Sequence, residues 1–107
     1  GNSKVWMLEK VLIKNKDFSP KKNADKDILI FYENGHCIFQ PLKSLGELPG
    51  KKGEYSVFSA EKSLSIYFKN EKWDFTLTTI EEDKLILEPT KNSDLKYTLE
   101  LMPLPEL

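Results

Sequence analysis

Apolar and polar residues alternate along most of the second half of the chain, and short charged turns separate the alternating runs. In residues 63–69, for example, Leu64, Ile66 and Phe68 are spaced two residues apart. A period of two places one face of each strand in a core and the other in water. The pattern predicts strands typical of an up-and-down antiparallel sheet, at residues 53–60, 63–69, 72–80, 84–90 and 95–102.

The first half of the chain contains three more expected strands, at residues 4–14, 27–33 and 36–41. The nearly continuous apolar run in the second of these favours a strand over a helix because it is short and rich in β-branched residues. Asn34 and Gly35 follow it, and this pair predicts a type I′ hairpin turn. The 107 residues are thus expected to form one all-β domain, an eight-stranded up-and-down antiparallel β-barrel whose last strand closes on the first.

The first strand changes its pattern midway. Trp6 and Leu8 share one face, whereas Val11 and Ile13 share the other, so we expect a bulge or bend near Lys10. Trp6 opens the strand that must close the sheet, and it shares a face with Leu8. We therefore expect Trp6 to be mostly buried and to plug one end of the barrel.

Aromatic residues are concentrated on the faces that should point inward. They could line a ligand pocket, or they could simply fill the interior, because eight strands enclose a space just wide enough for side chains to fill. The short strands imply a shallow barrel and favour a filled or half-filled interior. The candidate ligand-binding residues of this interior are Tyr55, Phe68, Trp73, Phe75 and Tyr97.

Residues 42–52 form an irregular segment that nevertheless contains three regularly spaced leucines. Leu42, Leu45 and Leu48 would share one side of a short helical turn. We expect this segment to lie across one mouth of the barrel as a lid, which adds the three leucines to the candidate ligand site. The leucines either cap the core permanently or belong to a lid that opens to admit a ligand.

The charge composition argues against a nucleic-acid partner. The 16 basic residues nearly balance the 17 acidic ones, and all 16 are lysines. No overall field attracts a polyanion, and the arginine side chain that best recognises phosphates and guanine is absent. Ten lysines and six acidic residues lie in residues 1–53, so the two halves of the chain carry opposite net charges.

No residue pattern indicates catalysis or a metal site. A glycine-rich phosphate loop and a serine nucleophile motif are both absent from the sequence. Cys37 and His36 would point to opposite faces of a strand, so they cannot form a nucleophile–base pair, and they are too few for a zinc site. A lone histidine gives little support to haem, and Glu81-Glu82-Asp83 lacks the spacing of a calcium loop. We expect a non-enzymatic protein without metal or cofactor.

Several short motifs occur in the order of the expected strands: Trp6-x-Leu8, Leu29-x-Phe31 before Asn34-Gly35, Gly53-x-Tyr55, Leu64-x-Ile66, Leu85-x-Leu87 and Tyr97-x-Leu99. This order resembles the small lipocalin-like domains of bacterial secreted or envelope lipoproteins. The resemblance implies a lipocalin-like barrel, export, and a lipid anchor on a cysteine upstream of this chain. It places the protein in the periplasm, at the outer membrane or outside the cell, and it transfers no catalytic residue.

These observations lead to two functional hypotheses. The first is a binding module of the bacterial envelope that takes a small apolar or amphipathic ligand in a shallow barrel mouth. The alternative is a protein-interaction or inhibitor barrel that binds a protein partner through its rim loops. No apolar stretch is long enough to span a membrane, so the upstream lipid anchor is the only membrane attachment expected. Gly1-Asn2-Ser3 looks like the start of a trimmed chain.

Overall fold

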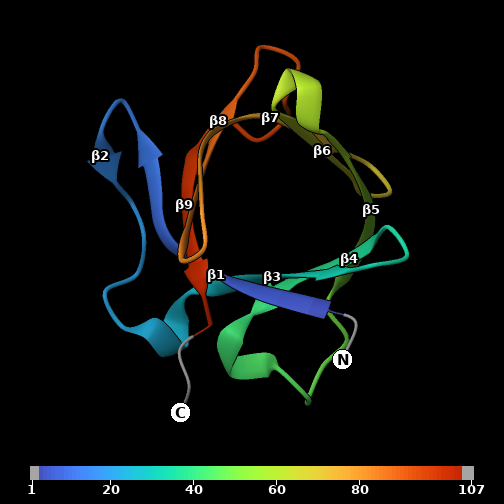
Figure 1. Ribbon diagram of the computed structural model, residues 1–107. Helices are drawn as coiled ribbons and strands as arrows, with labels where there is room; N and C mark the ends of the chain where they lie inside the picture. The colour runs from blue at the N-terminus through green and yellow to red at the C-terminus, as the bar shows by residue number, and fades with distance from the viewer. Residues whose placement is uncertain (1–2, 105–107) are drawn as a thin grey trace.

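The computed structural model describes residues 3–104, so Gly1 and Asn2 and the end of the C-terminal tail lie outside the described residues. Within that range the chain forms a ring of antiparallel strands and no α-helix (Figure 1). The strands are β1 (Ser3–Ile13), β2 (Lys16–Asp17), β3 (Asp27–Tyr32), β4 (His36–Pro41), β5 (Lys51–Phe58), β6 (Ser63–Tyr67), β7 (Lys72–Glu81), β8 (Lys84–Pro89) and β9 (Thr98–Pro103). Three single turns of 3₁₀ helix connect them, η1 (Asn23–Asp25), η2 (Leu42–Ser44) and η3 (Ser59–Glu61).

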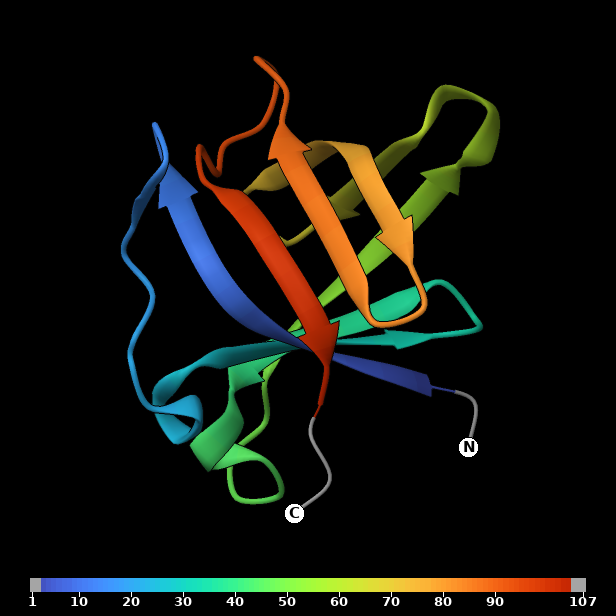
Figure 2. The same ribbon diagram turned by 60° about the vertical axis from the view of Figure 1, so that its left-hand side comes forward.

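The barrel closes through β1, which pairs with β3 along one edge and with β9 along the other. Trp6 is opposite Pro103 and Leu12 is opposite Thr98 in the closing pair, and Figure 2 shows the two strands side by side. All other strands from β3 to β9 pair with their sequence neighbours. The predicted eight-stranded up-and-down antiparallel barrel is therefore confirmed. The short β2, which pairs with the end of β1, is an addition that the pattern did not predict.

The expected bulge in the first strand is also confirmed. The register of β1 against β9 shifts between Leu8 and Lys10, which leaves Glu9 as the extra residue. Because of this shift, Leu8 and Val11 both pack in the barrel interior although they are three residues apart. The buried Lys26 stabilises the bulge, since its ammonium group donates a hydrogen bond of 2.7 Å to the Glu9 carbonyl oxygen.

The hairpin turn at Asn34-Gly35 differs in type from the prediction. The loop between β3 and β4 has three residues, of which only Gly35 has a positive φ (88°), and the Gly35 N–H donates to the Tyr32 carbonyl oxygen. The hairpin is where the sequence predicted it, but type I′ is wrong, because the third loop residue takes the left-handed conformation instead. Both central residues of the β1–β2 turn, Lys14 and Asn15, have the positive φ of type I′.

Apolar side chains are buried on both sides of the wall formed by β1, β3 and β4. One cluster lies in the barrel interior and includes Leu29, Phe75 and Leu99. A second cluster on the outer face is centred on Met7, Ile28 and Ile30, with Ile38, Leu42 and Met102 packed against it. This outer cluster explains the unbroken apolar run in residues 28–32, since both faces of β3 need a cover.

Candidate functional site

The two ends of the barrel are built differently. The hairpin turn after β3, the η3 turn and the turn between β7 and β8 surround one end, which we call the turn end. The longer connections of residues 42–50 and 90–97 leave from the other end, which we call the loop end. The distinction matters because side chains fill only one of the two.

The loop end is packed with aromatic rings around the buried Trp73. Its ring centroid lies 4.8 Å from that of Phe68, 5.1 Å from Phe39 and 6.4 Å from Phe75, all in edge-to-face arrangements. Tyr97 is partly exposed and packs against the same cluster. Three predicted ligand residues, Phe68, Trp73 and Phe75, are therefore core residues at the filled half of the barrel, because their rings pack on one another. The fourth, Tyr97, covers this core and places its ring 6.2 Å from that of Phe18.

The turn end contains a pocket of about 720 Å³. The wall of the pocket is apolar and is formed by Trp6, Phe31, Tyr55, Val57, Leu64, Leu77, Ile80 and Leu85. The rim is polar and is formed by Ser3, Lys4, Glu33, Ser59, Lys62, Glu81 and Glu82. Tyr55 is the predicted interior residue that the structure places here. Trp6 is mostly buried, as expected, but it forms part of this wall, so the expectation that it plugs the end is wrong. The barrel is half-filled.

Two apolar side chains of the pocket wall are unusually accessible to water. Val57 is 49% exposed and Ile80 is 60% exposed. Val57 shares the inward face of β5 with Tyr55, and Ile80 is brought to the pocket by a register shift of β7 between Leu77 and Thr79. Inward-facing residues are normally buried, so their exposure shows that the pocket opens widely to solvent at this end.

Tyr55 and Phe31 form the aromatic side of the pocket. Their ring centroids are 4.9 Å apart in an edge-to-face contact. The Tyr55 hydroxyl donates a hydrogen bond of 2.6 Å to the Tyr32 carbonyl oxygen, so its proton is already engaged within the protein. The indole N–H of Trp6 is the only other side-chain hydrogen-bond donor in the apolar wall.

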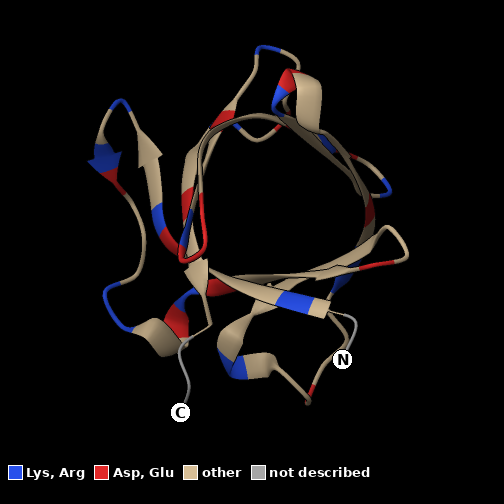
Figure 3. Ribbon diagram, viewed as in Figure 1, with Lys and Arg blue, Asp and Glu red and all other residues tan. Residues whose placement is uncertain are grey.

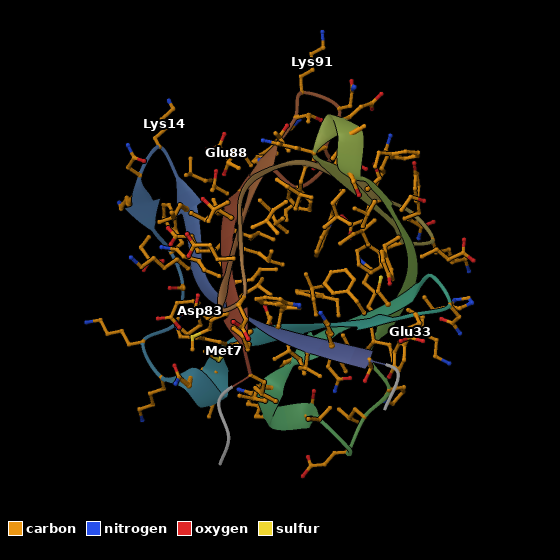
Figure 4. All side chains as sticks on the ribbon, in the orientation of Figure 1. Met7, Lys14, Glu33, Asp83, Glu88 and Lys91 are labelled. Carbon is orange, nitrogen blue, oxygen red and sulfur yellow. The ribbon has the colours of Figure 1, made fainter. Side chains whose placement is uncertain are left out.

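The rim is charged, with three glutamates and two lysines. Among residues 3–104, none of these five side chains forms an ion pair with another residue of the protein. Figure 3 shows acidic and basic segments around the ring, and Figure 4 shows Glu33 and the β7–β8 turn residue Asp83 on opposite sides of it. A ligand in the pocket would meet apolar groups inside and free charges at the entrance.

The predicted lid is wrong. Leu42 packs against the outer cluster, Leu45 and Leu48 are 46% and 67% exposed, and none of the three lines the pocket. The segment lies outside the wall, below β3 and β4 in Figure 1. The physical reason is the outer cluster, whose apolar side chains are buried from water by this segment. A Cβ atom on Gly50 would lie 2.3 Å from Ile38 Cγ2, so the segment packs directly against that wall.

Several pocket residues were missed by the sequence prediction. Alternation marked Leu64, Leu77 and Leu85 as inward-facing, but it carries no information about which end is filled. Ile80 was hidden for a second reason, because the register shift in β7 changes its face. Phe31 lies in the continuous apolar run, where alternation cannot distinguish inside from outside.

His36 and Cys37 point to opposite faces of β4, as the sequence predicted. Cys37 is buried, and desolvation together with the nearby Glu54 carboxylate raises the pKa of its thiol to about 11. His36 is exposed. In the described part of the chain, no three side chains of the metal-binding types gather into a possible site, and no helix has the length and apolarity to cross a membrane.

No protein-family model, curated protein or solved structure matches this chain. The resemblance to lipocalin-like lipoproteins therefore stays a prediction from the order of the strand motifs, and the pocket must be interpreted from its own geometry.

Proposed function

We propose that this protein is a non-enzymatic binding module that takes a small apolar or amphipathic molecule into the pocket at the turn end. The observation that carries the proposal is the exposure of Val57 and Ile80, two wall residues of an open apolar pocket. A ligand that covers them would remove apolar surface from water, which stabilises the complex by about 25 cal/mol for each Å² buried.

The size and lining of the pocket support this proposal. Its volume of about 720 Å³ falls within the range of roughly 300–1,000 Å³ that is usual for small-molecule sites. The wall residues are aromatic or aliphatic, and the Tyr55 proton is engaged with the Tyr32 carbonyl. The part of the ligand that enters the barrel should therefore be largely hydrocarbon, and the Trp6 indole N–H is the one other side-chain donor of the wall that could meet an acceptor on it.

The charged rim supports an amphipathic ligand. Lys4, Lys62 and the three rim glutamates can meet a polar or charged group that stays at the entrance while the apolar part is inside. The proposed location in the bacterial envelope, and the lipid anchor upstream, rest on the resemblance of the strand motifs alone.

Two neighbouring residues on opposite faces of β5 give a matched test. Val57 lines the pocket, whereas Phe58, 56% exposed, does not. We expect an uncharged fluorescent probe such as phenylnaphthylamine to bind the protein, and Val57→Asp to weaken binding at least about tenfold by placing a charge in the apolar wall. Phe58→Asp should leave probe binding unchanged.

The tryptophans provide a second readout of the same titration. Trp6 is in the pocket wall and Trp73 is at the filled end, so energy transfer to the probe should fall strongly in Trp6→Phe. If the probe does not bind, or if Val57→Asp and Phe58→Asp have equal effects, the pocket is not the binding site. In that case the alternative of a protein partner bound by the rim loops gains support.

A further inference from the structure

We propose that the outer face around residues 42–52 docks on an anionic lipid bilayer. We call this surface the leucine face and define it by the exposed Leu45 and Leu48 together with Lys43 and Lys52. It is separate from the pocket, since no residue of this segment lines the pocket. The inference therefore does not depend on the proposed ligand.

The leucine face presents its apolar side chains from an ordered turn. The Leu45 N–H donates to the Leu42 carbonyl oxygen at 3.1 Å, and the Leu48 N–H donates to the Ser44 carbonyl oxygen at 3.2 Å. Leu42 anchors this turn to the outer cluster, while Leu45 and Leu48 remain 46% and 67% exposed. Gly46, with φ of +84°, allows the chain to reverse between them.

Lysines flank these leucines in the sequence and occur on the neighbouring η1 segment. Lys43 and Lys52 are exposed on the segment itself, and Lys52 lies on the outer wall opposite Ile38 of the outer cluster. Lys21 and Lys22 are exposed just before η1. The η1 turn is joined to η2 by the ion pair of Lys43 with Asp25 (3.6 Å) and by the hydrogen bond from the Leu42 N–H to the Lys26 carbonyl oxygen (2.9 Å).

The charge of this region is positive although the whole chain is slightly negative. Its exposed lysines are Lys21, Lys22, Lys43 and Lys52, of which Lys43 pairs with Asp25, and its acidic residues are the three carboxylates Asp25, Asp27 and Glu47. The two remaining lysines are engaged elsewhere, since Lys26 donates to the Glu9 carbonyl oxygen and Lys51 pairs with Glu71. Figure 3 shows both basic and acidic residues on the segments below the barrel.

This combination favours an anionic bilayer as the occupant. Single exposed leucines are common on protein surfaces, but two leucines on one anchored turn can enter the interfacial layer together. The flanking lysines can stay at the level of the phosphates, and basic residues near an anionic surface each add a favourable electrostatic contribution. A neutral bilayer would not use the lysines. An acidic partner without an apolar interior would not use the leucines.

The test is sedimentation of the protein with vesicles of pure phosphatidylcholine and with vesicles of an equimolar mixture of phosphatidylcholine and phosphatidylglycerol. We expect binding to the mixed vesicles, weaker at high salt, and little binding to the neutral ones. Leu45→Ser with Leu48→Ser should lower the partition coefficient by about tenfold or more, because two apolar contacts are lost. Lys43→Gln with Lys52→Gln should lower it by a similar factor.

The matched control is Phe58→Ser, which removes an equally exposed apolar side chain at the turn end and should bind vesicles like the unchanged protein. Circular dichroism and a thermal melt establish that each variant is folded. Absence of binding to the mixed vesicles would overturn the proposal. So would a loss of vesicle binding in Phe58→Ser as large as the loss in the leucine double variant. It would also be overturned if the leucine variants abolished a dimer seen in solution, since the face would then cover a second copy of this chain.

Discussion

The Ser65 hydroxyl donates a hydrogen bond of 2.5 Å to Asp74 Oδ1 across the β6–β7 pair. The other carboxylate oxygen of Asp74 accepts a bond of 2.6 Å from Thr90 Oγ1, and the Asp74 N–H donates to Ser93 Oγ at 3.0 Å. Asp74 therefore fixes the connection of residues 90–97 to the outer wall of the barrel. Ser65 and Ser93 are buried, so their hydroxyl groups depend on these partners.

We predict that this network makes stability depend on pH. The hydrogen bonds from Ser65 and then Thr90 lower the pKa of Asp74 in the folded protein. As the pH falls, Asp74 therefore binds a proton in the unfolded state before it does so in the folded state. Its contribution to the free energy of unfolding is complete above the ordinary carboxyl pKa of about 4. That contribution is lost as the pH falls through the pKa of Asp74 in the folded protein. Urea unfolding from neutral to acidic pH measures this change.

The matched variant is Asp74→Asn, which keeps an oxygen acceptor but does not titrate. It should unfold more easily at neutral pH by about 1–3 kcal/mol, because a charged acceptor is lost. Its free energy of unfolding should vary less with pH below about 4 than that of the unchanged protein. Identical acid dependence of the two proteins would show that Asp74 is not responsible.

The two tryptophans should differ in their contributions to stability. Trp73 is buried among aromatic rings, so Trp73→Ala should cost about 3–5 kcal/mol. Trp6 lines an open pocket and is partly exposed, so Trp6→Ala should cost less, about 1–2 kcal/mol. Denaturant melts measure both losses, and acrylamide should quench Trp6 much more than Trp73. A larger loss from Trp6→Ala would mean that the turn end is filled.

Local patterns predicted the path of the chain well and the site poorly, for identifiable reasons. Alternation located the strands around the ring, and the phase change around Lys10 located the bulge. The beginning of the last strand was placed at residue 95, three residues before Thr98, because Leu95 and Tyr97 keep the apolar spacing while packing on the core outside a strand. Alternation records only whether a residue faces inward.

Two features of the site depend on contacts between distant residues. Whether an inward ring fills the barrel depends on its partners, and Trp73 meets Phe39, which is far away in the sequence. The position of Leu42 depends on the outer cluster of Met7, Ile28 and Ile30, because the spacing of three leucines does not specify which apolar surface they cover. The lid prediction failed at this point.

Cys37 should be chemically unreactive in the folded protein. The thiol is buried and its pKa is raised to about 11 by desolvation and by Glu54, so little thiolate forms at neutral pH. We expect iodoacetamide to label Cys37 slowly in buffer and rapidly in denaturant. The rate should follow the unfolded fraction as denaturant is added. Fast labelling in buffer, at the rate of a free thiol, would contradict the burial of this residue.

Gly53 should be required for the packing of the loop end. A Cβ atom at this position would lie 2.8 Å from the backbone oxygen of Tyr67 and 2.9 Å from Phe68 Cδ1. The backbone oxygen cannot move without disturbing the β5–β6 pair, so Gly53→Ala should destabilise the protein by about 1–3 kcal/mol. Ser56→Ala on the same strand is the control, because Ser56 is exposed and should change stability by less than about 0.5 kcal/mol.

The same variant separates the two ends of the barrel. The displaced Phe68 ring contacts Trp73, so the fluorescence of Trp73 should shift in Gly53→Ala. The pocket at the turn end does not include Gly53 or Phe68, so the variant should still bind the hydrophobic probe under conditions in which it is folded. If Gly53→Ala is as stable as the unchanged protein, β5 and the Phe68 ring are not in close contact. If it is folded but loses probe binding, the two ends are not independent.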